Sequence, residues 1–595
     1  MQIQSDNSGK IKTSMKLYPK RKYYLLAIFL FLINSVAVAQ KKPSFSVNGT
    51  MGVTYEGYGL DRNPTGWTGY SPRRPWNQVR FSFMPNFKFG KNFSLPVNIN
   101  VAALPTNFAG PYSGFIPGGP KQNFKQWITN PINNITINPT YKWAGLLLGT
   151  QYLKYSDLST GDIGVFGAGF DLKPGLYRIK FFTGVSQQGI NYFSGPPTLT
   201  GAFKRTNWMF QLGKEREGKY AVAFNFAKGK DVPTSSSPPP VTIKPQEGFV
   251  ISMVSDIYFK KGWYVKAEGA QSVFTKDETM ALNPLVKSFK PFIDAHTATA
   301  TDYALQGSIG KKSANFDIGV STKYYGAGFQ TIGYPYQQPD RLDYTLNTRF
   351  NAFKKTTNVV ASLGQRVNNV SNTSLKAKQF IGNLNWFTQF NDNWSVNINY
   401  NNFGFQTASG LNPFGIKNVS NDLGINPTYT WSNTKMSHLV SLSYNYSKYD
   451  ERDVLTGLTT SNNTHTTLLT YIPTFFTKDI TPDFSVLYFY NNVPGIKTTL
   501  ATISSALSMP VAKKKVQLRG QLQYTLGKLN AFSSNNNLIA SCDIGWKLTK
   551  KLTWNTYLTT NYFKYGNEIL PNGANYTETS CRTGFQYRFD TKKQK

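Results

Sequence analysis

Apolar and polar residues alternate one by one along many short segments of this chain, and this alternation constrains the fold more than any other feature. Val79, Phe81 and Phe83, for example, are separated by polar residues such as Arg80 and Ser82. Side chains of a β-strand point alternately to its two faces, so each such segment predicts a strand with one apolar and one polar face. The pattern recurs in roughly two dozen segments, among them 93–101, 394–401 and 516–526.

The connections between these segments alternate in length. Short connections include residues 90–92, 173–175, 260–262, 311–313, 354–356, 391–393 and 549–551. Longer loops lie between them, at 56–77, 105–133, 188–205, 231–245, 276–301, 326–339, 403–422 and 450–463. Short turns on one side and long loops on the other are typical of membrane-spanning β-barrels. We therefore predict an all-β fold, a closed antiparallel transmembrane barrel with an even number of strands, about 26, and with 22 to 24 as the lower alternatives.

The start of the chain has the form of a secretory signal. Basic residues at 16 and 20–22 precede the apolar run Leu25–Ile33, and Ala37-Val38-Ala39 forms a small-residue cleavage site. We expect residues 1–39 to be a leader with a cleaved signal peptide, residues 40–589 to form one barrel domain, and residues 590–595 to form a short tail. No apolar run is long enough for a transmembrane helix.

The composition fits a β-barrel, and the net charge limits the classes of partner that we expect. Mean hydropathy is −0.36 and 15% of the residues are aromatic, which is too polar for a bundle of membrane helices but suits strands with one wet face. The formal net charge is +35. A secreted chain meets little nucleic acid, so we expect no nucleic-acid partner and attribute the charge to contact with anionic lipid headgroups or anionic solutes.

The last predicted strand carries a pattern that points to a family. Arg582, Gly584, Tyr587 and Phe589 fit the order polar, any, Gly, any, any, aromatic, any, aromatic. This resembles the terminal signal of bacterial outer-membrane β-barrels, which the barrel-assembly machinery reads. The resemblance implies an outer-membrane location, with outer-membrane lipid and the assembly machinery as partners. Because the first connection is long and short turns are periplasmic in such barrels, we expect both termini in the periplasm. In that family the chain usually stops at the aromatic residue, whereas here Asp590–Lys595 follow.

A second resemblance is local. Segments Asn138–Trp143 and Gly149–Ser156 are similar to strand pairs of uncharacterised outer-membrane barrels from the Bacteroidota, of the Flavobacterium type. This resemblance implies a cell-envelope compartment, leaves other envelope proteins open as partners, and implies no substrate.

Charged residues on the polar faces are the candidate lumen-lining groups. They are Arg80, Lys88, Arg178, Lys180, Arg519, Asp543, Arg582 and Arg588. Cations outnumber acids in this set, and a lumen of one sign biases a pore. If the pore conducts, the sequence predicts a preference for anionic solutes.

Two loops are rich in apolar side chains. The segment Pro105–Pro131 contains the candidate constriction residues Phe108, Tyr112, Phe115, Phe124 and Trp127, and Met280–Ala295 reads as short helical pieces broken by prolines. Either loop fits an extracellular cap without a ligand, or a constriction or partner surface.

Chemistry-bearing residues are sparse. The three histidines are His296, His438 and His465, and none has a serine or aspartate pattern that predicts catalysis. No Cys/His cluster suggests a metal. Cys542 and Cys581 fall on apolar faces of strands that are not neighbours, so we expect free, buried thiols. We predict no enzymatic activity, no metal and no cofactor.

The width of the predicted barrel limits the functions that it can have. About 26 tilted strands enclose a lumen roughly 50 Å across, which must be obstructed if the membrane is to stay sealed. The first strand follows the cleavage site almost at once, which leaves no room for an N-terminal plug domain. We expect a porin-like or transporter channel whose mouth is narrowed by its own loops; the alternative is the barrel subunit of a larger secretion or protein-insertion assembly.

Overall fold

The computed structural model describes residues 45–63, 77–103, 128, 133–161, 163–192, 194, 200–283, 292–333, 337–374, 376–406, 417–452, 459–532, 534–566 and 574–591. These residues form one antiparallel sheet of 27 strand segments. Their bounds are β1 Phe45–Asn63, β2 Asn77–Phe89, β3 Phe93–Ala103, β4 Asn134–Ile137, β5 Thr140–Tyr141, β6 Ala144–Leu153, β7 Ile163–Leu172, β8 Tyr177–Gln187, β9 Lys204–Arg216, β10 Tyr220–Val232, β11 Glu247–Tyr258, β12 Trp263–Thr275, β13 Thr299–Lys312, β14 Phe316–Tyr325, β15 Arg341–Ala352, β16 Thr357–Asn368, β17 Ala377–Gln389, β18 Trp394–Gln406, β19 Lys417–Ser432, β20 Met436–Arg452, β21 Thr459–Phe475, β22 Thr481–Val493, β23 Ile496–Val511, β24 Val516–Leu529, β25 Asn535–Lys547, β26 Leu552–Lys564 and β27 Asn575–Asp590.

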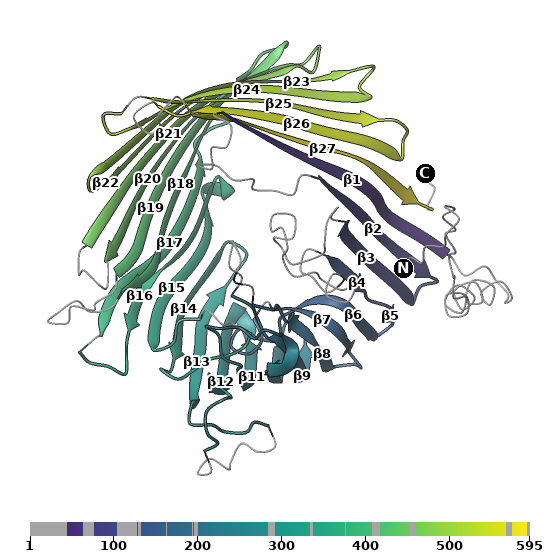
Figure 1. Cartoon of the computed structure of the whole chain (residues 1–595), viewed down its shortest axis with the longest axis vertical. Coiled ribbons are helices and arrows are strands. Elements are labelled where there is room, and N and C mark those ends of the chain that lie inside the picture. Colours follow the sequence, from purple (N-terminus) through teal and green to yellow (C-terminus); the bar gives the residue numbers. More distant parts are fainter. Residues whose placement is uncertain are drawn as a thin grey trace, which may run out of the picture.

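The sheet closes on itself. Every strand pairs with its neighbour in the chain, and β1 pairs with both β2 and β27, so the first and last strands meet (Figure 1). Segments β4 and β5 both pair with β3 and β6 and together fill one position in the wall. The protein is therefore a closed 26-stranded antiparallel barrel, which confirms the predicted fold and strand number. Within the described residues, no helix is long and apolar enough to cross a membrane.

The two faces of the wall differ as the alternation predicts. On β2, Phe81 lies beside Val53 of β1 and Val101 of β3, whereas Arg80 lies beside Thr54 on the opposite face. Large apolar side chains on the Phe81 face are exposed to the surroundings; Leu522 is 55% exposed and Ile503 is 65% exposed. Such a band would be a liability in water, but it suits a surface that contacts lipid.

Aromatic side chains form a belt near the short turns. Trp394, Tyr429, Trp431 and His438 are stacked along β18–β20, with successive ring centroids 4.6, 5.2 and 4.5 Å apart. The hydroxyl of Tyr471 on β21 lies 2.8 Å from Nδ1 of His438. Belts of this kind mark the level at which a barrel crosses from apolar lipid to headgroups.

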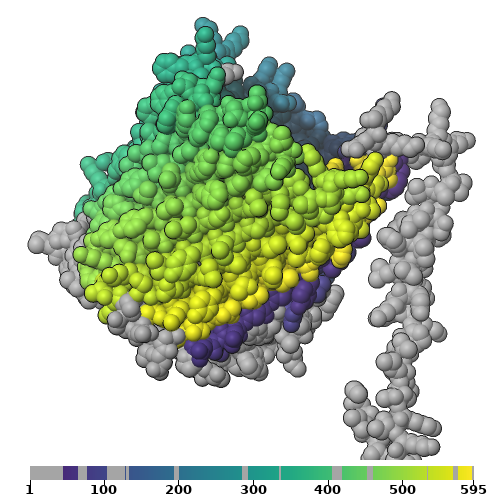
Figure 2. Space-filling model, turned by 90° about the horizontal axis from the view of Figure 1, so that it is seen from above, coloured from purple at the N-terminus to yellow at the C-terminus, as the bar shows by residue number. Residues whose placement is uncertain are grey.

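Closure occurs at a long seam between β1 and β27. The pairing runs from Asn48 opposite Asp590 to Asn63 opposite Asn575, and Figure 2 shows the last strand against the first on the outer surface. A side chain at Gly584 would place its Cβ 2.5 Å from the carbonyl oxygen of Val53, so only glycine allows the two strands this approach.

The last strand of the barrel wall continues beyond Phe589, the aromatic residue at which the family pattern ends. Strand β27 includes Asp590. The Thr591 N–H donates to the Val47 carbonyl at 3.0 Å, and the Val47 N–H donates to Thr591 Oγ1 at 2.8 Å. The first two residues of the expected tail thus belong to the hydrogen-bonded seam, and residues 592–595 lie outside the described residues.

The cysteines are free, as expected, but the protein does not bury them. Cys542 on β25 and Cys581 on β27 both lie opposite Leu558 on β26, so one strand separates them. Two strand spacings amount to about 10 Å, which is beyond disulfide reach. Cys542 is exposed and Cys581 partly exposed, because the apolar face to which they belong is the outer surface of the barrel.

The assignment of the two faces can be tested on β2. Phe83→Arg should lower the free energy of unfolding in lipid by about 2–4 kcal/mol, because it places a charge on the apolar outer face. Ser82→Arg, on the inner face, is the matched control and should cost less. Urea titration of barrels folded into vesicles measures both. Equal costs, or labelling of a cysteine at Phe81 but not at Asn86 by a water-soluble maleimide, would contradict the assignment.

The seam gives a second test. Deleting Tyr587–Lys595 removes the partners of Asn48–Met51 on β1, so the barrel should fail to close and the protein should be lost to proteolysis. Deleting only Lys592–Lys595 keeps every pairing described above and should leave folding unchanged. Heat-modifiability on gels and the amount in the membrane fraction report folding. Similar folding of the two variants would show that the seam does not depend on these residues.

Candidate functional site

A segment between β6 and β7 folds into the barrel. We call residues Lys154–Gly161 the first inner segment. Leu158 and Ser159 are 0% exposed. Leu158 packs against Val250, Ala270 and Ala304, which lie on the wall face opposite exposed residues such as Met253 and Leu305. The face with Met253 and Leu305 is the outer one, so this segment covers the inner face.

Hydrogen bonds to the wall hold the first inner segment. The Leu158 N–H donates to Oε1 of Glu268 on β12 at 3.1 Å. The hydroxyls of Ser156 and Ser252 on β11 lie 3.0 Å apart. From β9, the Gln211 amide donates to the Tyr155 carbonyl at 3.2 Å. Three polar side chains of the wall beneath this segment thus gain a hydrogen-bond partner, as buried polar groups generally do.

A second inner segment, Gly326–Gly333 after β14, packs on the first. The Thr331 hydroxyl donates to the Ser159 carbonyl at 2.7 Å. Phe329 is 1% exposed and joins the apolar cluster around Leu158. A Cβ at Gly333 would lie 2.3 Å from the Thr160 carbonyl carbon, so glycine is required where the two segments touch. The two segments form an inner layer on one side of the lumen.

Apolar residues on the inner wall explain why this layer forms where it does. Val165, Phe182 and Met209 are buried in a cluster with Leu153 and Tyr155. Apolar side chains on a face that otherwise meets water gain stability when they are covered. Sequence reasoning missed the first inner segment, which it did not include among the longer loops. A signal for this segment was present in the sequence. Ser156–Gly161 is a run of turn-forming residues around a single leucine, and the neighbouring strands carry apolar residues on the face that is polar elsewhere.

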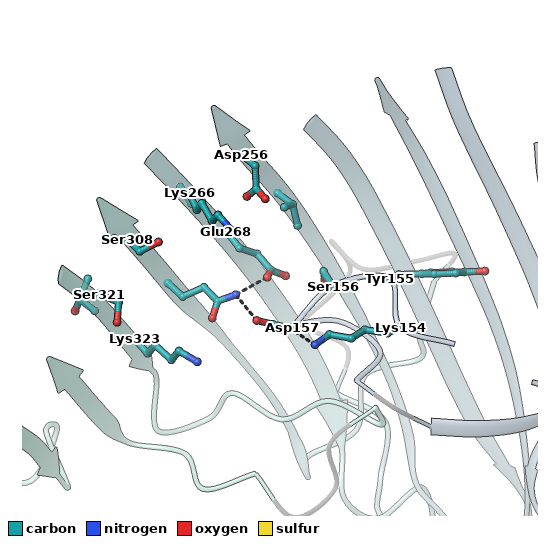
Figure 3. Close-up of a pocket in the computed structure, with 15 residues that line it drawn as sticks. Lys154, Tyr155, Ser156, Asp157, Asp256, Lys266, Glu268, Ser308, Ser321 and Lys323 are labelled. Carbon is teal, nitrogen blue, oxygen red and sulfur yellow. Dashed lines mark hydrogen bonds and ion pairs between the residues drawn. The ribbon is translucent and has the colours of Figure 1, made fainter. Parts of the chain in front are cut away.

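A recess of about 470 Å³ remains between the first inner segment and the wall formed by β11–β14. The side chains that surround it are shown in Figure 3. Two rows of residues cross the wall there. One row consists of Glu268, Gln306 and Lys323, which lie opposite one another on successive strands; the other consists of Asp256, Lys266, Ser308 and Ser321. We call this site the lumen recess.

The floor of the lumen recess is an internal polar network. Nζ of Lys154 lies 2.6 Å from Oδ1 of Asp157. The Gln306 amide donates to Glu268 at 2.7 Å and to Asp157 at 3.4 Å. Burial raises the pKa of Asp157, but the hydrogen bond and the charge of Lys154 outweigh that effect and leave the pKa below its ordinary value. Asp157 is therefore a carboxylate at neutral pH.

Each of the eight predicted lumen residues lies on the polar face of its strand, but none lies at the lumen recess. Glu56 of β1 is 3.7 Å from Arg80 and 3.6 Å from Arg582, across the seam. Arg519 is 3.7 Å from Asp483 and lies opposite Asp543.

The other predicted lumen residues lie towards the short turns. Arg178 is 3.6 Å from Asp171 and 3.5 Å from Glu215. Nζ of Lys180 lies 5.5 Å from the ring centre of Tyr155, at the edge of the inner layer. Lys88 is opposite Ser46, and Arg588 is opposite Thr50. Sequence alternation thus predicted the face, but the recess is lined by a different set of residues.

The predicted loops have different outcomes. The candidate constriction residues Phe108, Tyr112, Phe115, Phe124 and Trp127 lie outside the described residues. In the loop 276–301, Ile293 packs with Phe226, Phe249 and Val273, and the ring of Phe292 lies 5.4 Å from that of Phe226. These wall residues belong to the outer face, so this part of the loop covers the outside of the wall and does not enter the lumen. The apolar side chains of the outer face are what this part of the loop packs against.

The histidines are separated from one another. His438 and His465 lie on the outer face beside tyrosine hydroxyls, 2.8 Å from Tyr471 and 2.9 Å from Tyr444. Nδ1 of His296 lies 2.7 Å from the Met280 carbonyl oxygen. In the part of the chain that the structure describes, no group of three His, Cys, Asp or Glu side chains is placed to hold a metal ion.

Comparison with known proteins gives remote similarities only. No family model and no curated protein matches the chain. The P pilus usher (PapC) translocation pore is 11% identical, with 91% of this chain and 98% of that chain covered and a TM-score of 0.34. Acinetobacter baumannii OccAB2 is 10% identical, with 64% and 100% covered and a TM-score of 0.28. Pseudomonas aeruginosa OpdK with vanillate is 8% identical, with 65% and 98% covered and a TM-score of 0.28. We draw no functional argument from similarities this low.

The inner layer can be tested at Leu158. Leu158→Ala should loosen the first inner segment, because it removes a fully buried side chain at a cost of about 2–5 kcal/mol. Hydrogen exchange of residues 154–161 should accelerate, while exchange of the wall strands stays slow. Leu346→Ala, an exposed position on the outer wall, is the control. Unchanged protection of the segment in Leu158→Ala would show that Leu158 does not hold it.

Proposed function

We propose that this protein is a channel of the bacterial outer membrane, with both termini in the periplasm and a lumen narrowed by its own inner segments. The apolar outer face and the aromatic belt support a place in a membrane. The described ends of the chain, Phe45 and Thr591, lie at the rim that carries the short turns, where Asn48 is opposite Asp590 and Phe45 is opposite Phe89. Short turns face the periplasm in barrels of this kind.

One observation carries the channel proposal. The first inner segment is built into the wall from the inside, with its backbone, its hydroxyls and its leucine all bound to inner-face residues of β9–β13. A segment held in this way narrows the lumen permanently and places a polar recess beside the remaining path. That arrangement suits selective passage of a small polar solute.

The charges of the lumen change the expected selectivity. The sequence alone predicts a preference for anions, because basic residues dominate the candidate set. In the structure Arg80, Arg582, Arg178 and Arg519 each lie within 4 Å of a carboxylate. Paired charges contribute little field at a distance, so we expect the anion preference to be small.

A second candidate function is a barrel subunit of a larger envelope assembly. It has one observation in its favour, a stack of aromatic side chains on the outer face at the long-loop end. The rings of Trp208 and Phe226 are 4.6 Å apart, and Phe249 and Phe292 continue the cluster. Phe226 and Phe249 are buried, whereas Trp208 is 37% and Phe292 40% exposed. Exposed aromatic side chains are common anchors for protein partners. Lipid and the barrel-assembly machinery remain the partners that we propose for either function.

We also propose that the protein is not an enzyme. The lumen recess contains carboxylates and amines but no histidine or cysteine beside them. Glu268 and Asp157 are already engaged by donors from the protein, so neither carboxylate is poised to act as a general base.

Conductance tests the proposal directly. Replacement of Lys154–Gly161 by a short Gly-Ser linker should raise the single-channel conductance in planar bilayers, on the order of twofold, because it removes one side of the inner layer. Glu268→Ala, which removes the acceptor of the Leu158 N–H, should act in the same direction with a smaller change. The control replaces the exposed loop residues Val241–Lys244 by glycines and should leave conductance unchanged. A folded but silent wild-type barrel that co-purifies with stoichiometric partners would instead favour the assembly role.

A further inference from the structure

The lumen recess is electrically balanced, unlike the chain as a whole. Three amines and three carboxylates line it; these are Lys154, Lys266, Lys323, Asp157, Asp256 and Glu268. The chain itself has more than twice as many basic as acidic residues. A net-neutral recess does not favour one sign of solute through its total charge, and it offers a side chain of opposite sign to each charged group of a zwitterion.

The six charges are not equally engaged. Asp157 is paired with Lys154 at 2.6 Å, and Glu268 accepts hydrogen bonds from Leu158 and Gln306. Lys266 lies over the rings of Tyr258 and Tyr264, at 5.9 and 5.8 Å from their centres. Within the described residues, neither Lys323 nor Asp256 has an ion-pair partner within 4 Å. Asp343, which lies opposite Lys323, is held by Arg366 at 2.7 Å instead.

Lys323 and Asp256 lie at opposite sides of the lumen recess. Asp256 is on β11 and Lys323 is on β14, two residues beyond the position in register with Asp256. Three strand spacings and two residues along the strand, about 16 Å, therefore separate their backbones. Both side chains line the recess (Figure 3). An extended dipeptide spans about 7 Å between its ends. The volume of about 470 Å³ is within the range of small-molecule sites.

We infer that the lumen recess binds a zwitterionic solute of about dipeptide size, with the solute carboxylate at Lys323 and its ammonium group at Asp256. This inference rests on the proposed function in assigning the recess to transported solutes. Ser308 on β13 lies between the strands of the two charged side chains and offers a hydroxyl to a peptide group. The Ser321 hydroxyl is already engaged by Thr345 and Asn347. Among the described residues that line the recess, Tyr155 is the one aromatic residue, and its ring points away from the recess (Figure 3).

Binding to the purified full-length chain tests the inference. Equilibrium dialysis in detergent would compare radiolabelled glycylglycine with two analogues that each lack one charge, glycylglycinamide and N-acetylglycylglycine. We expect glycylglycine to bind at least about tenfold tighter than either analogue, since each analogue loses one charged contact. Equal binding of the three probes, or no binding of any, would overturn the inference.

Variants locate the site and separate the two ends of the solute. Lys323→Met should abolish the advantage of glycylglycine over its amide, and Asp256→Asn should abolish its advantage over the acetylated form. Lys88→Met removes an inner-face lysine far from the recess and should change neither. A loss of discrimination in Lys88→Met equal to that in Lys323→Met would show that only the overall lumen charge matters, and would overturn the inference.

Flux into liposomes separates this inference from the channel proposal. Discriminating binding by a barrel that passes no solute would support the recess and overturn the channel. A conducting barrel that binds and passes the three probes equally would overturn the zwitterion site and leave the channel in place.

Discussion

The structure depends on one constraint, which is that every backbone N–H and C=O group facing lipid must find a partner within the protein. A sheet satisfies this condition only if it has no free edge, so the chain must bring its first and last strands together. The seam between β1 and β27 does so over the whole of β27 and over Asn48–Asn63 of β1. Gly584 allows the close approach, and Thr591 prolongs the hydrogen bonding to Val47. Closure then fixes which side chains point to the lumen.

Closure of so many strands creates a second problem, which is a wide lumen. The protein answers it with chain segments that lie against the inner wall. This solution is possible because the inner faces of β7–β13 carry apolar residues such as Phe182 and Val250 beside buried polar ones such as Asn225. The inner segments cover the apolar side chains and give hydrogen-bond partners to the polar ones. Stability and narrowing of the lumen therefore come from the same contacts.

The charges of the lumen depend on local pairing of side chains and not on the net charge of the whole chain. Most of the inner-face arginines described above are paired with carboxylates, and the lumen recess balances amines against carboxylates. The large positive total charge thus says little about what the lumen prefers. Two charged side chains of opposite sign, Lys323 and Asp256, face the recess without an ion-pair partner within 4 Å among the described residues, and the recess takes its proposed specificity from them. Lys266, opposite Asp256, and Asp157, near Lys323, act on them only at longer range.

The sequence by itself determined the strand pattern, the closed barrel, the strand number of about 26 and the face on which each strand residue lies, because period-two alternation and alternating turn lengths are local properties. It also predicted that Cys542 and Cys581 cannot pair, from their separate strands. It did not reveal the inner layer, because contacts such as Leu158 with Val250 join residues far apart in sequence, and a run of turn residues looks the same whether it faces water or a wall. It left the loop 276–301 open as a cap, a constriction or a partner surface, and tertiary packing placed its residues Phe292 and Ile293 against the outer wall. The lumen recess, too, was decided only by tertiary structure, since the register of four strands and one inserted segment brings its charges together.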